Sequence, residues 1–164
     1  MPDLTIVVGL GSNLGDRLAN LRRAVAELGT TGGLAVLGRS SVFESKPAGG
    51  PPQPDYLNAA VLLQCALSPA ALRERTACIE LALGRVRPDA VRWGPRTMDI
   101  DLLWSRGLAL DEPALELPHP RLTERAFALQ PLLELVPDAC DPRTGLGYVS
   151  LPAASLALHK VTRL

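Results

Sequence analysis

Apolar residues recur along the chain in two periods, and each period predicts a different secondary structure. Steps of three and four residues form one stripe over residues 14–28, which predicts an amphipathic helix; its members are Leu14, Leu18, Leu21, Val25 and Leu28. Asn13 precedes the stripe and is the predicted N-cap, since its side chain can accept a backbone hydrogen bond. Ser68 followed by Pro69 predicts the start of a second helix, which ends near Leu83.

Short apolar runs rich in β-branched residues predict four strands. They cover about residues 4–8, 34–44 and 56–67, and a last run that begins near Asp99. Segment 46–54 holds four prolines and two glycines, so it is neither helix nor inner strand and is predicted to be a loop. The order strand-helix-strand-strand-helix-strand predicts an α+β fold with a ferredoxin-like βαββαβ core and antiparallel pairing.

The remainder of the chain has a weaker pattern. A helical stretch is predicted over 123–135, in which Pro131 should kink or restart the helix, and a tail rich in proline and glycine follows. We find no internal repeat and no linker, so residues 1–164 are expected to form a single domain. A domain of this length buries about two-thirds of its unfolded surface.

Composition excludes several function classes. Lysine plus arginine and aspartate plus glutamate balance at 17 each, which argues against a nucleic-acid partner. No apolar stretch reaches 18 residues and the N-terminus lacks signal-peptide features, so no membrane association is expected. Cys65, Cys78 and Cys140 are odd in number and widely spaced, which predicts buried free thiols in a cytoplasmic protein.

Asp99 and Asp101 are the strongest candidate for chemistry. In a strand, side chains two residues apart share a face, so both carboxylates should point one way while Met98, Ile100 and Leu102 point the other. Two carboxylates about 5 Å apart repel each other by roughly 3 kcal/mol at an effective dielectric constant of about 20. A divalent cation between them would turn this repulsion into attraction.

Arg96 lies three residues before the aspartate pair and adds a planar cation that suits phosphate oxygens. Two carboxylates for Mg²⁺ beside an arginine are typical of phosphoryl transfer. A polar sheet edge with a surface ion pair is the structural alternative.

Three further segments carry candidate chemistry, and each also has a structural interpretation. The glycines around Gly11 follow a strand and resemble a phosphate-binding loop, although tight turns and close packing are the favoured explanation for them. Tyr56 and Asn58 suit the face and edge of a planar heterocycle, or the edge of a sheet. His119 stands between two prolines, where it could donate to a phosphate oxygen or have a structural role.

Two other function classes fit the same residues. A nucleotidyltransferase also carries paired aspartates on a ferredoxin-like sheet, but the balanced charge and the aromatic and asparagine candidates argue against it. A regulatory module that binds a small molecule could carry the aspartate pair merely solvated. Protection of the two polar loops from proteolysis by ATP and Mg²⁺ would argue against this second class.

Five segments taken together resemble the 6-hydroxymethyl-7,8-dihydropterin pyrophosphokinase family of folate enzymes. They follow the family's order over about residues 5–135, and the sequence Arg-Trp-Gly-Pro-Arg-Thr-x-Asp-x-Asp is highly specific. The resembling segments are 11–15, 53–61, 84–87, 92–101 and 117–121. The resemblance implies a ferredoxin-like core with flanking helices in a three-layer αβα sandwich, and a single pyrophosphokinase domain. It also implies transfer of pyrophosphate from ATP to the pterin hydroxymethyl group with release of AMP.

The resemblance also assigns roles to individual residues. Asp99 and Asp101 would hold two Mg²⁺ ions, and Arg85 and Arg96 would complete the catalytic set. The residues implied for ATP are Glu80, Arg87, Trp93, Arg96, Ile100, His119 and Arg125. Those implied for the pterin are Gly11, Ser45, Lys46, Ala48, Tyr56, Asn58, Trp93, Asp99 and Phe127. The family suggests a monomer with small-molecule partners. Pro120, where a tyrosine is common, and Cys78, at a position often polar on the adenine side, depart from the expected pattern.

Overall fold

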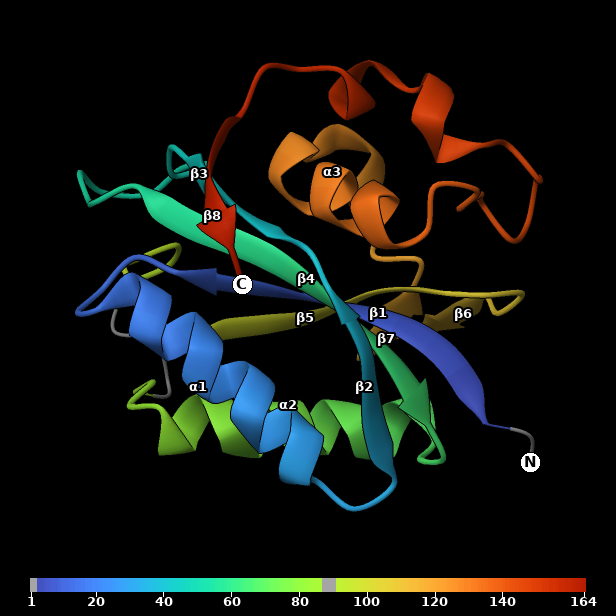
Figure 1. The fold of residues 1–164 in the computed structure, drawn as a ribbon, viewed down its shortest axis with the longest axis horizontal. Helices are drawn as coiled ribbons and strands as arrows, with labels where there is room; N and C mark the ends of the chain where they lie inside the picture. Colours follow the sequence, from blue (N-terminus) through green and yellow to red (C-terminus); the bar gives the residue numbers. More distant parts are fainter. Residues whose placement is uncertain (1–2, 87–90) are drawn as a thin grey trace.

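A six-stranded sheet forms the middle of the molecule (Figure 1). The computed structural model describes residues 3–86 and 91–164. Strand order is β5-β1-β4-β3-β8, with β2 also paired to β4, and all the pairings between these strands are antiparallel. The strands are β1 (Leu4–Ser12), β2 (Leu34–Arg39), β3 (Ser41–Ser45), β4 (Tyr56–Cys65), β5 (Asp99–Ser105) and β8 (His159–Arg163).

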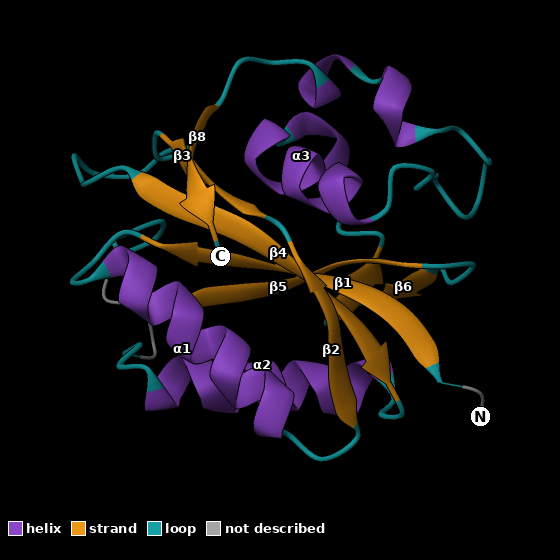
Figure 2. Cartoon of the chain, viewed as in Figure 1, coloured by secondary structure: helices purple, strands orange, loops and turns teal. Residues whose placement is uncertain are grey.

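Helices cover both faces of this sheet (Figure 2). α1 (Arg17–Thr30) and α2 (Pro69–Ala82) lie on one face, and α3 (Ala126–Leu135) lies on the other. Separate apolar cores fill the two interfaces; Leu21 of α1 is buried in the first and Leu129 of α3 in the second. The prediction of a ferredoxin-like α+β fold in three layers is confirmed.

β1 runs through the centre and divides its residues between the two cores. Ile6, Val8 and Leu10 pack toward α1 and α2, whereas Val7 packs toward α3. The next positions on the α3 side are Gly9 and Gly11, which carry no side chain. The Leu103 side chain covers Gly9, whereas Gly11 leaves backbone that a ligand can approach closely.

Two local predictions are wrong. The first helix is capped by Asp16, whose side chain accepts from Ala19 N at 3.0 Å, and Asn13 is used elsewhere. The strand predicted over 34–44 is broken at Ser40, because the Ser40 hydroxyl accepts from Ala60 N at 2.8 Å and separates β2 from β3.

The second helix begins as predicted. The Ser68 side chain accepts from Ala71 N at its start, and Pro69 is the first helical residue. The cysteines are free, but only Cys65 is buried, and Cys78 is exposed, which corrects the prediction of three buried thiols.

The C-terminal third returns over α3. A hairpin of β6 (Leu110–Glu112) and β7 (Leu115–Leu117) leads to a short 3-10 turn and then to α3, which continues through Pro131 without a break. The tail crosses α3 before β8 pairs with β3 (Figure 1). Among the described residues, no helix is long and apolar enough to cross a membrane.

Candidate active site

The strand register brings two predicted site residues to either side of one glycine. Gly11 of β1 pairs with Asn58 on β4 and with Asp99 on β5. One step along, Gly9 pairs with Ala60 and with Asp101. Residues paired across neighbouring strands face the same way, so the amide and both carboxylates lie on the α3 face.

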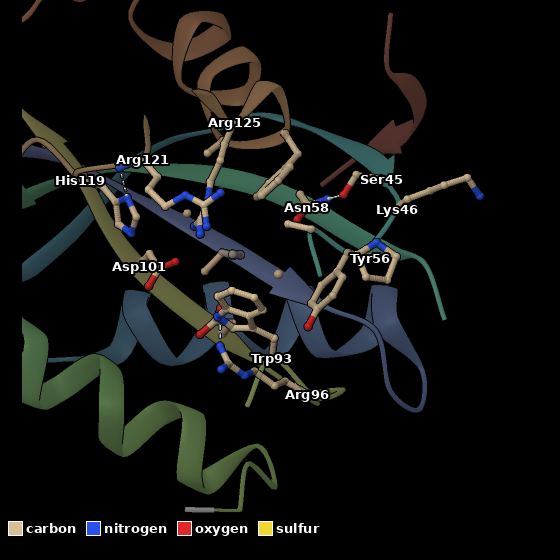
Figure 3. Close-up of a pocket in the computed structure, with 18 of the residues that line it drawn as sticks. Ser45, Lys46, Tyr56, Asn58, Trp93, Arg96, Asp101, His119, Arg121 and Arg125 are labelled. Carbon is tan, nitrogen blue, oxygen red and sulfur yellow. Dashed lines mark hydrogen bonds and ion pairs between the residues drawn. The ribbon is translucent and has the colours of Figure 1, made fainter. Parts of the chain in front are cut away.

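Two adjoining cavities meet at these carboxylates, one on the α3 face and one at the β5 edge beside α2. The first is lined by the glycines of β1, by residues 45–49, and by side chains from β4 and α3 (Figure 3). The second lies against α2, β5 and the β6–β7 turn. The residues that line both are Arg96, Asp99, Asp101 and His119. A ligand in each cavity would meet the other at these four side chains.

The two carboxylates have different environments. Asp99 is bound by two arginines, Arg85 through Nη1 at 2.7 Å and Arg96 through Nη1 at 3.1 Å. Burial, and then the charge of Asp99, raise the pKa of Asp101 to about 7, although Arg125 opposes this. Asp101 is therefore a carboxylate that would be stabilised by a further cation.

Glu80 joins the helix layer to the edge of β5. Its carboxylate accepts from Ile100 N at 2.7 Å and pairs with Arg85 Nη1 at 2.9 Å. The side chains of Glu80 and Arg85 are about 95% buried. Glu80 thereby holds the Arg85 guanidinium against Asp99, which lines both cavities.

One hydrogen bond determines which ring nitrogen of neutral His119 carries the proton. Arg121 N donates to His119 Nδ1 at 3.1 Å, so Nδ1 carries no proton and the neutral ring carries its proton on Nε2. Burial, and then the charge of Arg125, lower the pKa of His119 to about 4. At neutral pH the ring is uncharged and can donate Nε2–H to an oxygen in either cavity.

His119 gives a testable pH dependence of stability. Its folded-state pKa is about 4, below the ordinary value of 6.5, so between these values the unfolded chain binds more protons. His119 should therefore lower the free energy of unfolding as pH drops from 7 to 4.5, whereas protonation of Asp101, whose pKa is raised, should increase it. His119→Gln removes only the first contribution, so this variant should gain stability relative to wild type as the pH falls. Urea unfolding of both proteins at pH 7.5 and pH 5 measures this. Parallel pH profiles for the two proteins would contradict it.

Two arginines face the carboxylates from the α3 side. Arg121 and Arg125 reach into the first cavity opposite Asp101 (Figure 3). Burial, and then the charge of Arg121, lower the pKa of Arg125. Arg125 Nε is buried without a hydrogen-bond partner among the described residues. Such a pair of mutually repelling cations is stabilised by an anion between them.

The other end of the first cavity suits a flat polar ring. Asn58 Nδ2 donates to Ser45 Oγ at 2.8 Å, which fixes its amide and leaves Oδ1 near Gly11. Tyr56, Trp93 and Phe127 supply aromatic walls. An amide edge between aromatic faces can recognise a planar heterocycle.

A model of the 7,8-dihydro-6-hydroxymethylpterin-pyrophosphokinase family matches residues 7–137. The chain belongs to this family. Its members transfer pyrophosphate from ATP to hydroxymethyl-dihydropterin in folate synthesis, and the predicted activity is confirmed at this level.

Three bacterial proteins named 2-amino-4-hydroxy-6-hydroxymethyldihydropteridine pyrophosphokinase are similar to this chain along most of its length. The pyrophosphokinase of Synechocystis is 45% identical over 145 residues, 88% of this chain and 73% of that protein. The Methylorubrum extorquens protein is 47% identical over 80% of this chain and 82% of its own length. The Bacillus subtilis protein is 44% identical over 78% and 75%.

A solved structure gives the same fold. The chain superposes on an HPPK-DHPS crystal structure in complex with substrates with a TM-score of 0.72 at 10% identity. The match covers 94% of this chain and 43% of the other, so this pyrophosphokinase corresponds to less than half of that longer protein.

The structure brings together nearly all the predicted site residues. Those lining the first cavity are Gly11, Ser45, Lys46, Ala48, Tyr56, Asn58, Trp93, Arg96, Asp99, Asp101, His119, Arg125 and Phe127. Glu80, Arg85 and Ile100 line the second. Arg87 lies outside the described residues. The Lys46 side chain is 89% exposed, so its backbone is the part that faces the cavity.

Some placements differ from the sequence interpretation. Arg125 was assigned to ATP and Trp93 to both substrates, yet both line the first cavity and neither lines the second. Cys78 is not among the α2 residues that line the second cavity, which are Arg73, Thr76, Ala77 and Glu80. Arg121 and the 113–116 turn were missed; Arg121 belongs to the family motif, whereas the turn carries no sequence signal.

Gly11 provides a second test of the site. A Cβ at this position would lie 3.5 Å from Asn58 Oδ1 and 3.6 Å from Tyr56, which the fold accommodates, but it would project into the first cavity. Gly11→Ala should raise the KM for the pterin by roughly tenfold, since a methyl group would separate ring and amide. The melting temperature should stay unchanged.

Gly9→Ala is a comparison variant, because Gly9 lines the same cavity but lies under Leu103. Its Cβ would meet Leu103 Cδ1 at 3.0 Å, so this variant should lose stability because a core side chain must shift. Steady-state kinetics with varied pterin measure the effect of each variant on KM, and thermal melting measures its effect on stability. Equal KM values for Gly11→Ala and wild type would remove Gly11 from the pterin site.

Proposed function

We propose that residues 1–164 act as a single pyrophosphokinase domain in which the first cavity binds the pterin and the second binds ATP. The observation that supports this most directly is the meeting of the two cavities at Asp99, Asp101, Arg96 and His119. The pterin hydroxyl and the ATP phosphates would meet where charge is densest. Arg121 and Arg125 would hold phosphate oxygens from the opposite side.

The donor set fits Mg²⁺. Among the described residues no group of three or more histidine, cysteine, aspartate or glutamate side chains could enclose a metal. Magnesium at nucleotide sites is bound through one or two carboxylates, with substrate phosphates and water completing its shell. Asp99 and Asp101 match this, and the raised pKa of Asp101 indicates a carboxylate short of positive charge. Two Mg²⁺ ions, when bound there with ATP, would neutralise phosphate charge.

The chain's own residues position the reactants. Asn58 and the aromatic walls would orient the pterin so that its hydroxyl oxygen lies in line with the β-phosphorus. That oxygen loses its proton to solvent and forms the new bond to the β-phosphorus. The bond from the β-phosphorus to the oxygen shared with the α-phosphorus breaks, and AMP leaves with the electron pair. Arg85 and Arg96 stabilise the developing charge, and His119 donates Nε2–H without changing its protonation.

The decisive experiment measures AMP release from ATP with and without 6-hydroxymethyl-7,8-dihydropterin, in Mg²⁺ and in EDTA. AMP formation that needs both pterin and metal supports the proposal. Release of ADP instead would mean that the β-phosphorus is not attacked, and the mechanism would be wrong. Pterin binding without turnover would indicate a module that keeps only the first cavity.

A further inference from the structure

Arg143 belongs to the tail that follows α3, and it is absent from the linings of both cavities. It also comes after residue 137, where the match to the family model ends. Its Nη2 nonetheless lies within hydrogen-bond distance of three acceptors on the β6–β7 hairpin, which are Leu110 O at 3.3 Å, Leu117 O at 3.1 Å and a carboxylate oxygen of Asp111. One nitrogen of the tail thus holds a hairpin that is 26 to 33 residues earlier in the chain.

The loop that carries Arg143 is itself fixed at its base. Trp104 Nε1 on β5 donates to Cys140 O at 2.8 Å. The Asp141 carboxylate then accepts from Arg143 N at 2.7 Å and from Thr144 N at 3.2 Å, which closes a tight turn. The backbone of Arg143 therefore has a defined position relative to β5, and its side chain can act as a support.

The hairpin needs such a support because it is small. β6 and β7 have three residues each, and two of the three β6 residues are exposed. A two-stranded hairpin of this size is not stable by itself. Leu115 and Leu117 attach β7 to the apolar core. Arg143 attaches the open end of the hairpin, where Leu110 is paired with Leu117.

This hairpin borders the candidate site at its nucleotide end. Residues 113–116 form a wall of the second cavity, and Leu117 is two residues before His119, which lines both cavities. His119 N donates to Leu103 O at 2.8 Å, so His119 has its own attachment to β5. Residues 45–49 and the Gly11 and Asn58 pair lie on other strands, at the far end of the first cavity. A displaced hairpin would therefore change the second cavity and leave the pterin end as it is.

The exposure of Arg143 indicates a local effect on geometry and not a large effect on stability. Its side chain is 37% exposed and that of Asp111 is 76% exposed. An ion pair this open to solvent contributes little to the free energy of unfolding. The contacts with two main-chain carbonyls act directly on the hairpin backbone.

We propose that Arg143 is a positioning residue for the nucleotide. It holds the β6–β7 hairpin as a wall of the second cavity, so its loss weakens ATP binding and leaves pterin binding and the chemical step unchanged. The inference rests on the proposed function, in which the second cavity binds ATP. Arg143 touches neither substrate and acts only through the hairpin.

Arg143→Met tests this, because it keeps the aliphatic part of the side chain and removes every N–H donor. The KM for ATP should rise roughly five- to tenfold, since two hydrogen bonds to the hairpin are lost. Calorimetry should show the same change in the Kd of an ATP analogue with a methylene between the α- and β-phosphorus, which cannot react. The KM for pterin at saturating ATP, and kcat, should stay within about twofold of wild type. Hydrogen exchange over residues 110–117 should be faster.

Two further variants separate positioning from charge. All three acceptors surround the single atom Nη2, so a lysine ammonium with its three N–H groups can replace it, and Arg143→Lys should recover most of the ATP affinity. Arg143→Met combined with Asp111→Asn has the wild-type net charge and should still show the raised KM for ATP. A wild-type KM in this double variant would mean that Arg143 acts only through its charge, and the inference would be wrong.

Arg106→Met is the matched control. Arg106 also connects the segment after β5 to the tail, through two bonds to Asp138 at 3.1 Å each. None of the contacts described for Arg106 involves the hairpin. This variant should therefore keep the wild-type KM for ATP and the wild-type hydrogen exchange over residues 110–117.

Other results would overturn the inference. These are an unchanged KM for ATP in folded Arg143→Met, an equal rise in Arg106→Met, or a rise in the KM for pterin alone. If Arg143→Met does not fold, Arg143→Gln decides in the same way, because its amide is two bonds shorter than the guanidinium. Absence of AMP release by wild type would instead overturn the proposed function. Hydrogen exchange needs no activity, so it would still test whether Arg143 holds the hairpin.

Discussion

Asp101→Asn should abolish pyrophosphoryl transfer while leaving the protein at least as stable as wild type. The raised pKa of Asp101 shows that its charge is unfavourable in the protein alone, chiefly through burial and through Asp99. An amide of the same shape removes that repulsion. It also removes one of the two carboxylates proposed to bind Mg²⁺, so kcat should fall on the order of 10³-fold. AMP release and thermal melting at pH 8 measure the two effects.

The prediction is specific because activity should fall while stability stays the same or rises. A residue that only supports the fold would lose activity together with stability. Asp138→Asn serves as a control, because Asp138 is an exposed carboxylate that pairs with Arg106 far from either cavity lining. An Asp101→Asn enzyme that keeps a tenth or more of wild-type kcat would show that the aspartate pair does not hold the metal.

Arg85→Ala should cause the largest combined loss of stability and activity. Arg85 is buried between Glu80 and Asp99, at 2.9 Å and 2.7 Å. Its removal leaves the Glu80 carboxylate buried without that cation, which typically costs about 3–5 kcal/mol. It also removes a cation beside the phosphates, so kcat should fall roughly 10²- to 10³-fold. Urea unfolding and AMP release check the two parts.

Two further variants separate these effects. Glu80→Gln combined with Arg85→Ala should recover part of the stability but none of the activity, because a glutamine oxygen can still accept from Ile100 N. Arg106→Ala breaks an exposed ion pair and should cost less than about 1 kcal/mol. If Arg85→Ala is no more destabilising than Arg106→Ala, the buried pair is not a determinant of the fold.

The sequence pattern was most informative where side-chain period and burial agree. Asp99 and Asp101 alternate with apolar neighbours, and the structure buries Met98, Ile100 and Leu102 in the opposite core. That alternation predicted the strand and the shared face. Ser68 and Pro69 likewise predicted the start of α2, because their capping chemistry is local.

Contacts distant in sequence were not predictable in this way. Asn13 is a good N-cap by residue type, but its partners are 40 to 83 residues away, so nothing nearby indicates them. Asp16, three residues later, has the same capping ability and takes the role. The break at Ser40 similarly depends on a bond to Ala60 on another strand.

The candidate site likewise has features that the sequence could predict and features that depend on distant contacts. Which residues carry chemistry could be inferred from motifs, but the cavity that each lines depends on how α3 and the β6–β7 turn pack on the sheet. Trp93 and Arg125 therefore line only the first cavity. Residues 113–116 form a wall of the second cavity although their sequence has no distinguishing pattern.

The row formed by Asn58, Gly11 and Asp99 fixes the distance between the two ends of the candidate site. Two inter-strand spacings separate the Asn58 amide, proposed to bind the pterin, from the Asp99 carboxylate, proposed to bind the metal, about 9.6 Å between their Cα atoms. Backbone hydrogen bonds set this length, so no single side-chain substitution can stretch it. A slip of β4 by one residue would turn Asn58 to the opposite face. Only a change of strand register would alter the separation of Asn58 and Asp99. Pterins whose hydroxymethyl arm is longer or shorter should therefore be poor substrates.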